Sequence, residues 1–558
     1  MKLHFKHWPK RKPISLTIPK TTMDHNLEVS AQRYPDKTAI FYYGTTITYE
    51  QLFEQVNKMA GYLQKHLHVS KGDRVLLNMQ NSPQFIIAYY GILRAGAVVV
   101  PVNPMNTTEE LSLYVEDSAS KVAFAGQELA ERMIPLLDKT HLKHLIVAAY
   151  SEYISSDFQQ ELHEDISTPR KNFIEENVTA WKDALAANLI PNGTGVTSED
   201  LAALPYTSGS TGRPKGCMHT HDTIQANILS GAAWVDMTAD SVCLATLPLF
   251  HVTGMVHSMH IPIYCGSTIV LMTRWDKKLA HQLIKQYKCS HWINISTMVV
   301  DFLTNDNLNE SDFDSVMFIG GGGAPLPKAV GENLLNLTGL RYIEAYGLTE
   351  TISASHFNPM DHPKLQCLGI PTFGVDARII DPVSLKELGP NEEGEIIIHG
   401  PQVLKGYWRK PEETKKTFIT IDDKLFLRTG DIAKYDEDGY FFIVDRYKRM
   451  INAAGFKVWP TEVESALYKH PAIEQVCVIG VPDERRGESV KAVVVLRESQ
   501  KGKVTEDEII EWSKGQMANY KYPRFVEFVD RLPISGSGKI LWRQLQEEEL
   551  KKRQNLPN

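Results

Sequence analysis

Cysteine is scarce in this 558-residue sequence, which contains only six. The six are widely separated and never occur as CxxC, so neither a zinc site of the usual spacing nor a disulfide framework is expected. Long hydrophobic runs are missing too, because no stretch approaches the roughly 20 apolar residues of a membrane-spanning helix. The first residues lack the apolar segment of a secretory signal. We therefore expect a cytoplasmic protein in a reducing compartment.

An excess of basic residues is also missing. The sequence has 60 Lys and Arg against 67 Asp and Glu, which gives a formal net charge of −7. A general nucleic-acid binder would usually contain a strongly basic domain, so no nucleic-acid partner is expected.

Basic residues do cluster in one place, an N-terminal arm formed by residues 1–23. They surround Phe5 and Trp8. Two interpretations are open: a solvated arm, and an arm that makes weak peripheral contact with the anionic headgroups of a membrane. The cations concerned are Lys2, Lys6, Lys10, Arg11 and Lys12.

The chain is too long for one compact core, so at least two domains are expected. Over residues 24–445, apolar runs such as "DRVLLNM" (73–79) alternate with helical patterns such as the first part of "SPQFIIAYYGILRAGAVVVPV" (82–102). This alternation predicts an α/β fold with largely parallel sheets. Short strands between Gly and Pro turns indicate a β-rich module at about 368–445. Residues 151–200 look polar and irregular.

The pattern changes again at residues 446–449. Residues 450–558 then show a helix, two strands, a helix and a strand, which is enough for a separate small α+β domain.

The stretch "YTSGSTGRPKG" (206–216) looks designed to hold an anion. Its glycines let backbone N–H groups turn toward a phosphate, and its hydroxyls and Lys215 add donors and positive charge. It does not match the P-loop G-x-x-x-x-G-K-[ST], because Pro214 precedes the lysine and Gly216 follows it. We expect a phosphate-binding loop of a different geometry.

Five further segments follow in a characteristic order, and together with the first they resemble the adenylate-forming superfamily of acyl- and aryl-CoA synthetases, luciferases and adenylation domains. The resemblance covers roughly residues 25–545 and is strongest to bacterial fatty acid–CoA ligases. The segments are "GGGGAPL" (320–326), "EAYGLTE" (344–350), "LRTGD" (427–431), "DRYKRMINAAGFKVWPTEVE" (445–464) and "LPISGSGKI" (532–540).

The resemblance implies a two-step reaction that uses ATP, Mg²⁺ and coenzyme A. A carboxylate attacks the α-phosphorus of ATP and releases pyrophosphate, and a thiol then displaces AMP from the acyl-adenylate. It also implies a large N-terminal domain of layered α/β sheets with a small β-barrel-like module, and a smaller mobile C-terminal α+β domain.

The resemblance also assigns roles to single residues. Thr207 and Glu350 would support Mg²⁺, and Asp431 would bind the ribose hydroxyls with help from Arg446. The β- and γ-phosphates would be surrounded by Thr207, Ser208, Gly209, Ser210, Thr211, Gly212 and Lys215. The adenine would lie along Gly323, Ala324 and Pro325 beside Tyr346, with Gly347 and Thr349 also in the nucleotide site.

The C-terminal segment would complete the chemistry. Lys539 would contact the carboxylate and the α-phosphate during adenylation, and rotation about Lys448 would then remove it. After rotation Gly455 and Phe456 would line the tunnel for the pantetheine arm.

The acyl group would contact His251, which could orient the carboxylate, and Met255. No acidic residue follows His251 to pair with an ammonium, so an amino-acid substrate is disfavoured. Some long-chain relatives carry a gating tryptophan where this chain has Met255. Gly254 and the run 320–323, which includes Gly321, Gly322 and Gly323, are expected to leave space for a chain or ring larger than acetate.

These features favour a medium- or long-chain fatty acid as the substrate, with an aromatic carboxylate second. A carrier-protein-loading enzyme and a luciferase-like oxygenase share the same motifs, and a sensor without turnover is a further alternative. A homodimer is a further expectation.

Overall fold

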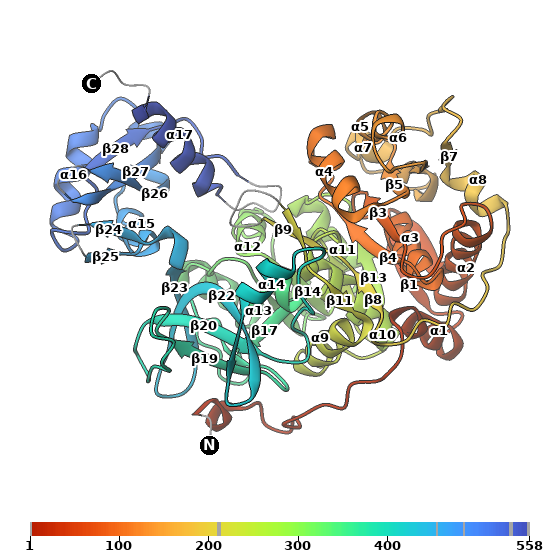
Figure 1. Ribbon diagram of the computed structural model, residues 1–558, viewed down its shortest axis with the longest axis horizontal. Helices are drawn as coiled ribbons and strands as arrows, with labels where there is room; N and C mark the ends of the chain where they lie inside the picture. The colour runs from red at the N-terminus through yellow and green to blue at the C-terminus, as the bar shows by residue number, and fades with distance from the viewer. Residues whose placement is uncertain (1–2, 209–213, 454–455, 484–485, 535–539, 555–558) are drawn as a thin grey trace. The chain divides into compact units, whose positions relative to one another are not determined.

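The computed structural model describes residues 3–208, 214–453, 456–483, 486–534 and 540–554. The chain forms two compact units (Figure 1). The first comprises Met1–Ala377 and Ile398–Leu427, and the second comprises Arg378–Ile397 and Arg428–Asn558. In the described residues, no helix is both long enough and apolar enough to cross a bilayer.

One sheet of the first unit has seven strands, most of them parallel. In spatial order they are β11 (His219–Thr220), β8 (Leu201–Ala203), β4 (Val98–Pro101), β3 (Arg74–Asn78), β5 (Val122–Gly126), β6 (His144–Ala148) and β7 (Val178–Ala180). The α-helices between Tyr49 and Ala186 are α2 (Tyr49–Lys65), α3 (Pro83–Arg94), α4 (Thr108–Ser118), α5 (Ala130–Met133), α6 (Leu136–Lys139), α7 (Glu164–Ser167) and α8 (Trp181–Ala186).

Helix α3 shows how the sequence specifies these elements. The side chain of Ser82 accepts a hydrogen bond from the backbone N–H of Phe85, and Pro83 occupies the first turn, where its missing N–H is tolerated. Eleven of its residues are buried, from Pro83 to Leu93. The helix therefore reads as a continuous apolar run, and β4 follows as expected.

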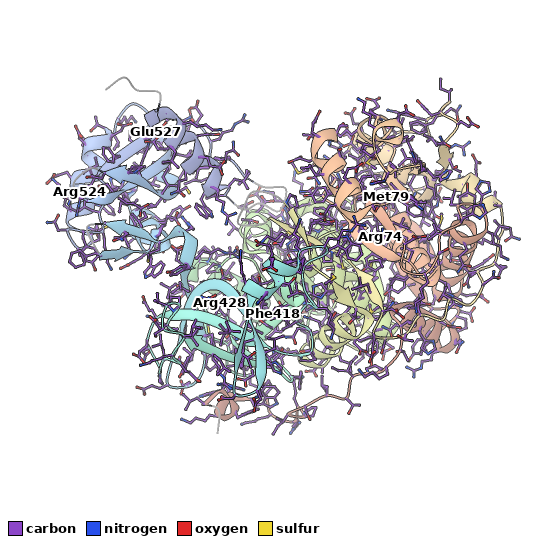
Figure 2. The ribbon with its side chains drawn as sticks, in the orientation of Figure 1. Arg74, Met79, Phe418, Arg428, Arg524 and Glu527 are labelled. Atoms are coloured by element: carbon purple, nitrogen blue, oxygen red, sulfur yellow. The ribbon has the colours of Figure 1, made fainter. Side chains whose placement is uncertain are left out.

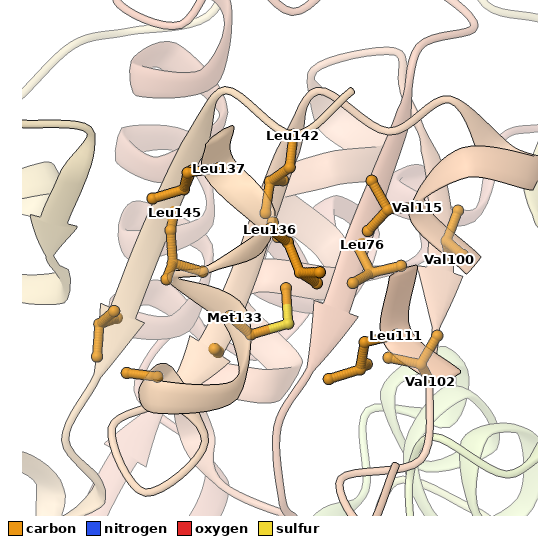
Figure 3. Close-up of a cluster of buried hydrophobic side chains, with 14 of the residues drawn as sticks. Leu76, Val100, Val102, Leu111, Val115, Met133, Leu136, Leu137, Leu142 and Leu145 are labelled. Carbon is orange, nitrogen blue, oxygen red and sulfur yellow. The ribbon is translucent and has the colours of Figure 1, made fainter. Parts of the chain in front are cut away.

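A hydrophobic cluster fills the space between this sheet and helices α4–α6 (Figure 3). Leu76 of β3 belongs to it, and Asn78, two residues on, shares the same face because strand side chains alternate. Asn78 is fully buried, and within the described chain neither atom of its amide has a hydrogen-bond partner. An amide in such a place costs stability.

We expect Asn78→Leu to raise the free energy of unfolding by about 1 kcal/mol, since it removes unsatisfied polar atoms. Asn81→Leu is the control: the Asn81 amide bonds Leu247, Met272 and Leu249, so the variant should lose about 2 kcal/mol or more. Urea titration of both variants measures these changes in the free energy of unfolding. A destabilised Asn78→Leu protein would show that this amide is satisfied in solution.

A second, nine-stranded sheet forms the rest of the α/β layers. In spatial order it contains β18 (Ile370–Pro371), β17 (Ser353–Phe357), β16 (Ile343–Leu348), β15 (Phe318–Gly322), β14 (His291–Asn294), β12 (Val242–Ala245), β13 (Thr268–Leu271), β1 (Thr38–Tyr42) and β2 (Thr45–Thr48). Its helices include α1 (Met23–Arg33), α9 (His221–Trp234), the π-helical η3 (Gly254–His260), α10 (Ile261–Cys265), α11 (Lys277–Tyr287), α12 (Ser296–Phe302) and α13 (Lys328–Thr338). The parallel strands β12–β16 confirm the predicted α/β pattern.

Two expectations about the first unit need correction. Residues 151–200 are not wholly irregular, because β7 joins the sheet and Trp181 of α8 is fully buried. The N-terminal arm is not simply solvated: Trp8 packs edge-on against Trp234 and Phe373, and the Lys12 ammonium bonds Ala233 and Asp236. Large aromatic surface is more stable packed than exposed.

The β-rich module forms a five-stranded sheet, and the boundary between the two units passes through it. Its strands are β19 (Asp376–Ile380), β20 (Gly394–His399), β22 (Lys424–Tyr435), β21 (Phe418–Ile421) and β23 (Phe441–Arg446), and α14 (Pro411–Thr417) precedes β21.

The C-terminal part has the predicted order of helix, two strands, helix and strand. These are α15 (Pro460–Leu467), β26 (Ile473–Asp483), β27 (Gly487–Leu496), α16 (Glu506–Lys514) and β28 (Phe525–Phe528). The short strands β24 (Ile451–Ala453) and β25 (Phe456–Val458) and the helix α17 (Trp542–Gln554) complete it.

Candidate functional site

The stretch predicted to bind an anion begins and ends in a β-hairpin of the first unit. Strands β9 (Tyr206–Ser208) and β10 (Pro214–Gly216) are antiparallel, and Lys215 lies directly opposite Thr207. The hairpin therefore brings together the hydroxyl and the ammonium that the resemblance assigns to the nucleotide. The predicted contacts Gly209, Ser210, Thr211 and Gly212 lie outside the described residues, as does the side chain of Ser208.

Lys215 is only 7% exposed, and its ammonium lies close to Glu413 and Tyr407. Its ammonium donates to the Glu413 carboxylate of α14 at 2.5 Å, and it lies 5.1 Å from the centre of the Tyr407 ring. A buried ammonium needs such compensation, because desolvation disfavours its charged form.

Glu350 joins the same group of residues from another part of the chain. It belongs to the short helix η5 (Thr349–Thr351), and its carboxylate accepts a hydrogen bond from the Tyr407 hydroxyl at 3.0 Å. Tyr407 thus contacts both Glu350 and Lys215. Burial raises the pKa of Tyr407, so its hydroxyl stays protonated and remains a donor. No sequence motif had pointed to Tyr407.

The loop predicted to contact adenine follows β15. Gly323, Ala324 and Pro325 are exposed, whereas Glu344 at the start of the "EAYGLTE" segment is buried. The Glu344 carboxylate accepts hydrogen bonds from the backbone N–H groups of Leu326 at 2.8 Å and Cys367 at 3.1 Å. Glu344 therefore fixes the end of this loop. Sequence analysis missed it, although an acidic residue within a buried strand was a usable signal.

Three further predicted nucleotide contacts lie at the end of β16 and the start of η5. The Tyr346 ring lies edge-on to His356 with centres 5.7 Å apart, and Gly347 is exposed. The carbonyl of Thr349 accepts a hydrogen bond from the buried His219 ring at 2.8 Å. Burial lowers the pKa of His219 to about 4, so this ring is a neutral structural donor at pH 7.

The predicted ribose-binding pair lies within the second unit. Asp431 of β22 is opposite Arg446 of β23, and the Arg446 guanidinium contacts the Asp431 carboxylate at 2.9 Å. Buried Glu395 accepts hydrogen bonds from the Gly430 backbone at 3.0 Å and from Arg428, which is labelled in Figure 2. Glu395 therefore holds the turn before Asp431. The sequence did not identify it.

The remaining C-terminal candidates are only partly described. Lys448 lies in a short 3₁₀ helix, η6 (Tyr447–Arg449), and its side chain is outside the described part, as are Gly455 and Lys539. Phe456 is 55% exposed and stacks on Tyr520 with ring centres 4.7 Å apart.

His251 precedes η3, and its carbonyl accepts a hydrogen bond from the backbone N–H of Met255. Met255 is fully buried, and the Tyr89 hydroxyl of α3 contacts its sulfur at 3.3 Å. The two histidines of η3 are uncharged at pH 7, because burial lowers the pKa of His257 to about 4 and that of His260 to about 3. The residues of η3 are therefore apolar or neutral.

The expectation that Gly254 and the glycine run simply leave space is wrong for most of these positions. A Cβ at Gly254 would lie 2.2 Å from the Pro248 carbonyl oxygen, and one at Gly321 would lie 1.8 Å from that of Asn294. A Cβ at Gly322 would lie 2.4 Å from the Ala345 oxygen. These glycines permit close backbone approach. Gly323 differs: its φ is +92° and its surroundings are open.

Comparison with known proteins agrees with this geometry. A long-chain-fatty-acid–CoA ligase of Bacillus subtilis is 35% identical over 97% of each chain, and a feruloyl-CoA synthase of an Amycolatopsis species is 33% identical over 92% of this chain and 96% of its own. The ATP-bound crystal structure of MatB from Rhodopseudomonas palustris matches with a TM-score of 0.80 at 28% identity, over 95% of this chain and 99% of that one.

Family models match both parts of the chain. Residues 462–539 match the C-terminal domain of AMP-binding enzymes, and residues 27–408 match the AMP-binding enzyme itself. The match over residues 27–408 covers well over half of the sequence. The chain therefore belongs to the AMP-binding enzyme family.

Proposed function

We propose that this chain is an ATP-dependent carboxylic acid–CoA ligase that works through an acyl-adenylate and releases pyrophosphate and then AMP. The observation that carries the proposal is the group formed by Thr207, Lys215, Tyr407 and Glu350. It joins the anion-binding hairpin to the "YGLTE" carboxylate. Such a group suits a polyphosphate, because phosphoryl chemistry depends on positioning and on neutralisation of charge.

Mg²⁺ fits the oxygen donors of this group. The Thr207 hydroxyl and the Glu350 carboxylate would hold the ion, which would neutralise phosphate charge. In the described residues, no cluster of three or more His, Cys, Asp or Glu could hold a metal by itself. One carboxylate with substrate phosphates is a usual Mg²⁺ environment. Asp431 and Arg446 would bind the ribose, and Lys539 would act at the α-phosphate.

A medium- or long-chain fatty acid is the proposed substrate. The relative from Bacillus subtilis bears the name of a long-chain ligase, and the η3 segment offers apolar or neutral side chains. No carboxylate follows His251 in "HVTGM", so a substrate ammonium would lack a partner there. An aromatic acid is the second candidate, supported by the likeness to the feruloyl-CoA synthase.

A panel of carboxylates with ATP and CoA tests this proposal. Fatty acids from octanoate to palmitate should give kcat/KM values at least about tenfold above benzoate and ferulate, because each added methylene gains binding energy in an apolar pocket. Pyrophosphate release and mass spectrometry of the thioester are the measurements. A preference for ferulate would contradict the fatty-acid assignment, and transfer to a holo carrier protein but not to CoA would contradict the acceptor.

Three other expectations stay predictions. A cytoplasmic location and a homodimer rest on the sequence. Peripheral contact with anionic lipid headgroups rests on Lys6, Lys10 and Arg11, which are exposed.

A further inference from the structure

The Glu413 carboxylate forms an ion pair with Lys215, the residue that the proposed function assigns to phosphate binding. The Glu413 carboxylate lies 2.5 Å from the Lys215 ammonium, whose side chain is 9% exposed, while that of Glu413 is 33% exposed. An anion that approaches Lys215 must therefore displace this carboxylate or share the cation with it.

Glu413 lies on the short helix α14 (Pro411–Thr417). No residue of α14 is buried. The Thr414 hydroxyl accepts a hydrogen bond from the Tyr407 backbone at 2.9 Å and donates to the Lys410 carbonyl. A helix without a buried face has little packing energy to lose when its position changes.

We propose that Glu413 is a positioning residue that occupies Lys215 when no phosphate is bound and competes with the bound phosphates. This inference rests on the proposed function, since it takes Lys215 as a ligand of the β- and γ-phosphates. The competition weakens ATP binding and speeds the departure of pyrophosphate, because the carboxylate returns to the ammonium as the product leaves. No covalent step is involved.

Glu413→Gln tests the competition because it keeps the shape of the side chain and removes its charge. Its matched control is Glu412→Gln, which changes the net charge equally at an exposed neighbour on the same helix. Calorimetry with ATP–Mg²⁺ and with pyrophosphate, without carboxylic acid, should show about threefold to tenfold tighter binding of both ligands to Glu413→Gln. Glu412→Gln should match the unmodified protein.

Steady-state kinetics should agree with the calorimetry. In Glu413→Gln the KM for ATP should fall, and pyrophosphate should inhibit at about threefold to tenfold lower concentration. Glu413→Asp keeps the charge and should retain the affinities of the unmodified protein. An equal effect of the Asp and Gln substitutions would show that side-chain shape matters rather than charge, and would overturn the proposal.

Two other outcomes would also decide the question. Weaker or unchanged ATP binding in Glu413→Gln, with an unchanged thermal unfolding midpoint, would show that Glu413 does not compete for Lys215. The inference and the proposed function can also fail separately. If Glu413→Gln binds ATP more tightly than the unmodified protein but neither protein converts any acid to a thioester, the competition at Lys215 stands and the proposed function fails.

Discussion

Lys539→Ala is expected to slow acyl-adenylate formation by about 100- to 1000-fold. A donor aimed at charge that develops in the transition state is worth this much in other enzymes. The second step should remain close to normal, because Lys539 is proposed to act only at the carboxylate and the α-phosphate. The variant should therefore convert supplied acyl-adenylate and CoA to thioester at nearly the unmodified rate.

Separate assays of the two half-reactions measure this difference. Pyrophosphate release reports the first step, and thioester formation from synthetic acyl-adenylate reports the second. Lys514→Ala is the control, because it removes an exposed lysine of α16 whose described partner is Glu511. Equal losses in both steps would contradict the role given to Lys539.

Lys448→Pro is expected to slow thioester formation by about 100-fold while adenylation is retained. Proline fixes φ near −65° and removes the backbone N–H, so the backbone change needed for rotation is restricted. Small misplacements of reacting groups can cost this much. Asp445 and Arg449 lie on either side and form an ion pair at 3.8 Å, and Arg449 also pairs with Glu464.

Single-turnover kinetics with and without CoA measure the two steps in this variant. Lys448→Ala keeps backbone freedom and separates the loss of the side chain from the restriction of the backbone. If Lys448→Pro forms thioester at the normal rate, rotation about this residue is not required.

Much of the fold follows from patterns within single segments. The strand at 74–78, the apolar helix α3 and the strand β4 were predictable because a buried parallel strand and its crossover helix are both rich in apolar residues. Thr207, Lys215 and Glu350 were predicted as site residues from motifs. In the structure Lys215 lies opposite Thr207 in the hairpin, and Tyr407 contacts both Lys215 and Glu350.

The residues that sequence analysis missed act through contacts between distant segments. Glu413 lies in the charged stretch "KPEETKK", which is typical of a solvated helix, and Lys215 is 198 positions away. Glu344 and Glu395 are buried acids that fix backbone N–H groups of other loops. A sequence pattern cannot show such pairings.

Glycine and tryptophan show a second limit of sequence analysis. A glycine such as Gly321 can open a pocket or admit a neighbouring backbone, and only the contacts distinguish the two cases. Trp8 lies in a basic arm, yet its partner Trp234 lies on α9, far along the chain. Local composition carries no information about that partner.

In the proposed reaction the carboxylate attacks the α-phosphorus of ATP. Incubation of the protein with ATP, Mg²⁺, CoA and a fatty acid labelled with ¹⁸O in its carboxylate tests this most directly. We predict that an ¹⁸O atom appears in AMP, and that AMP, pyrophosphate and thioester form in equal amounts. Label in inorganic phosphate together with ADP would place the attack at the γ-phosphorus and rule out an acyl-adenylate.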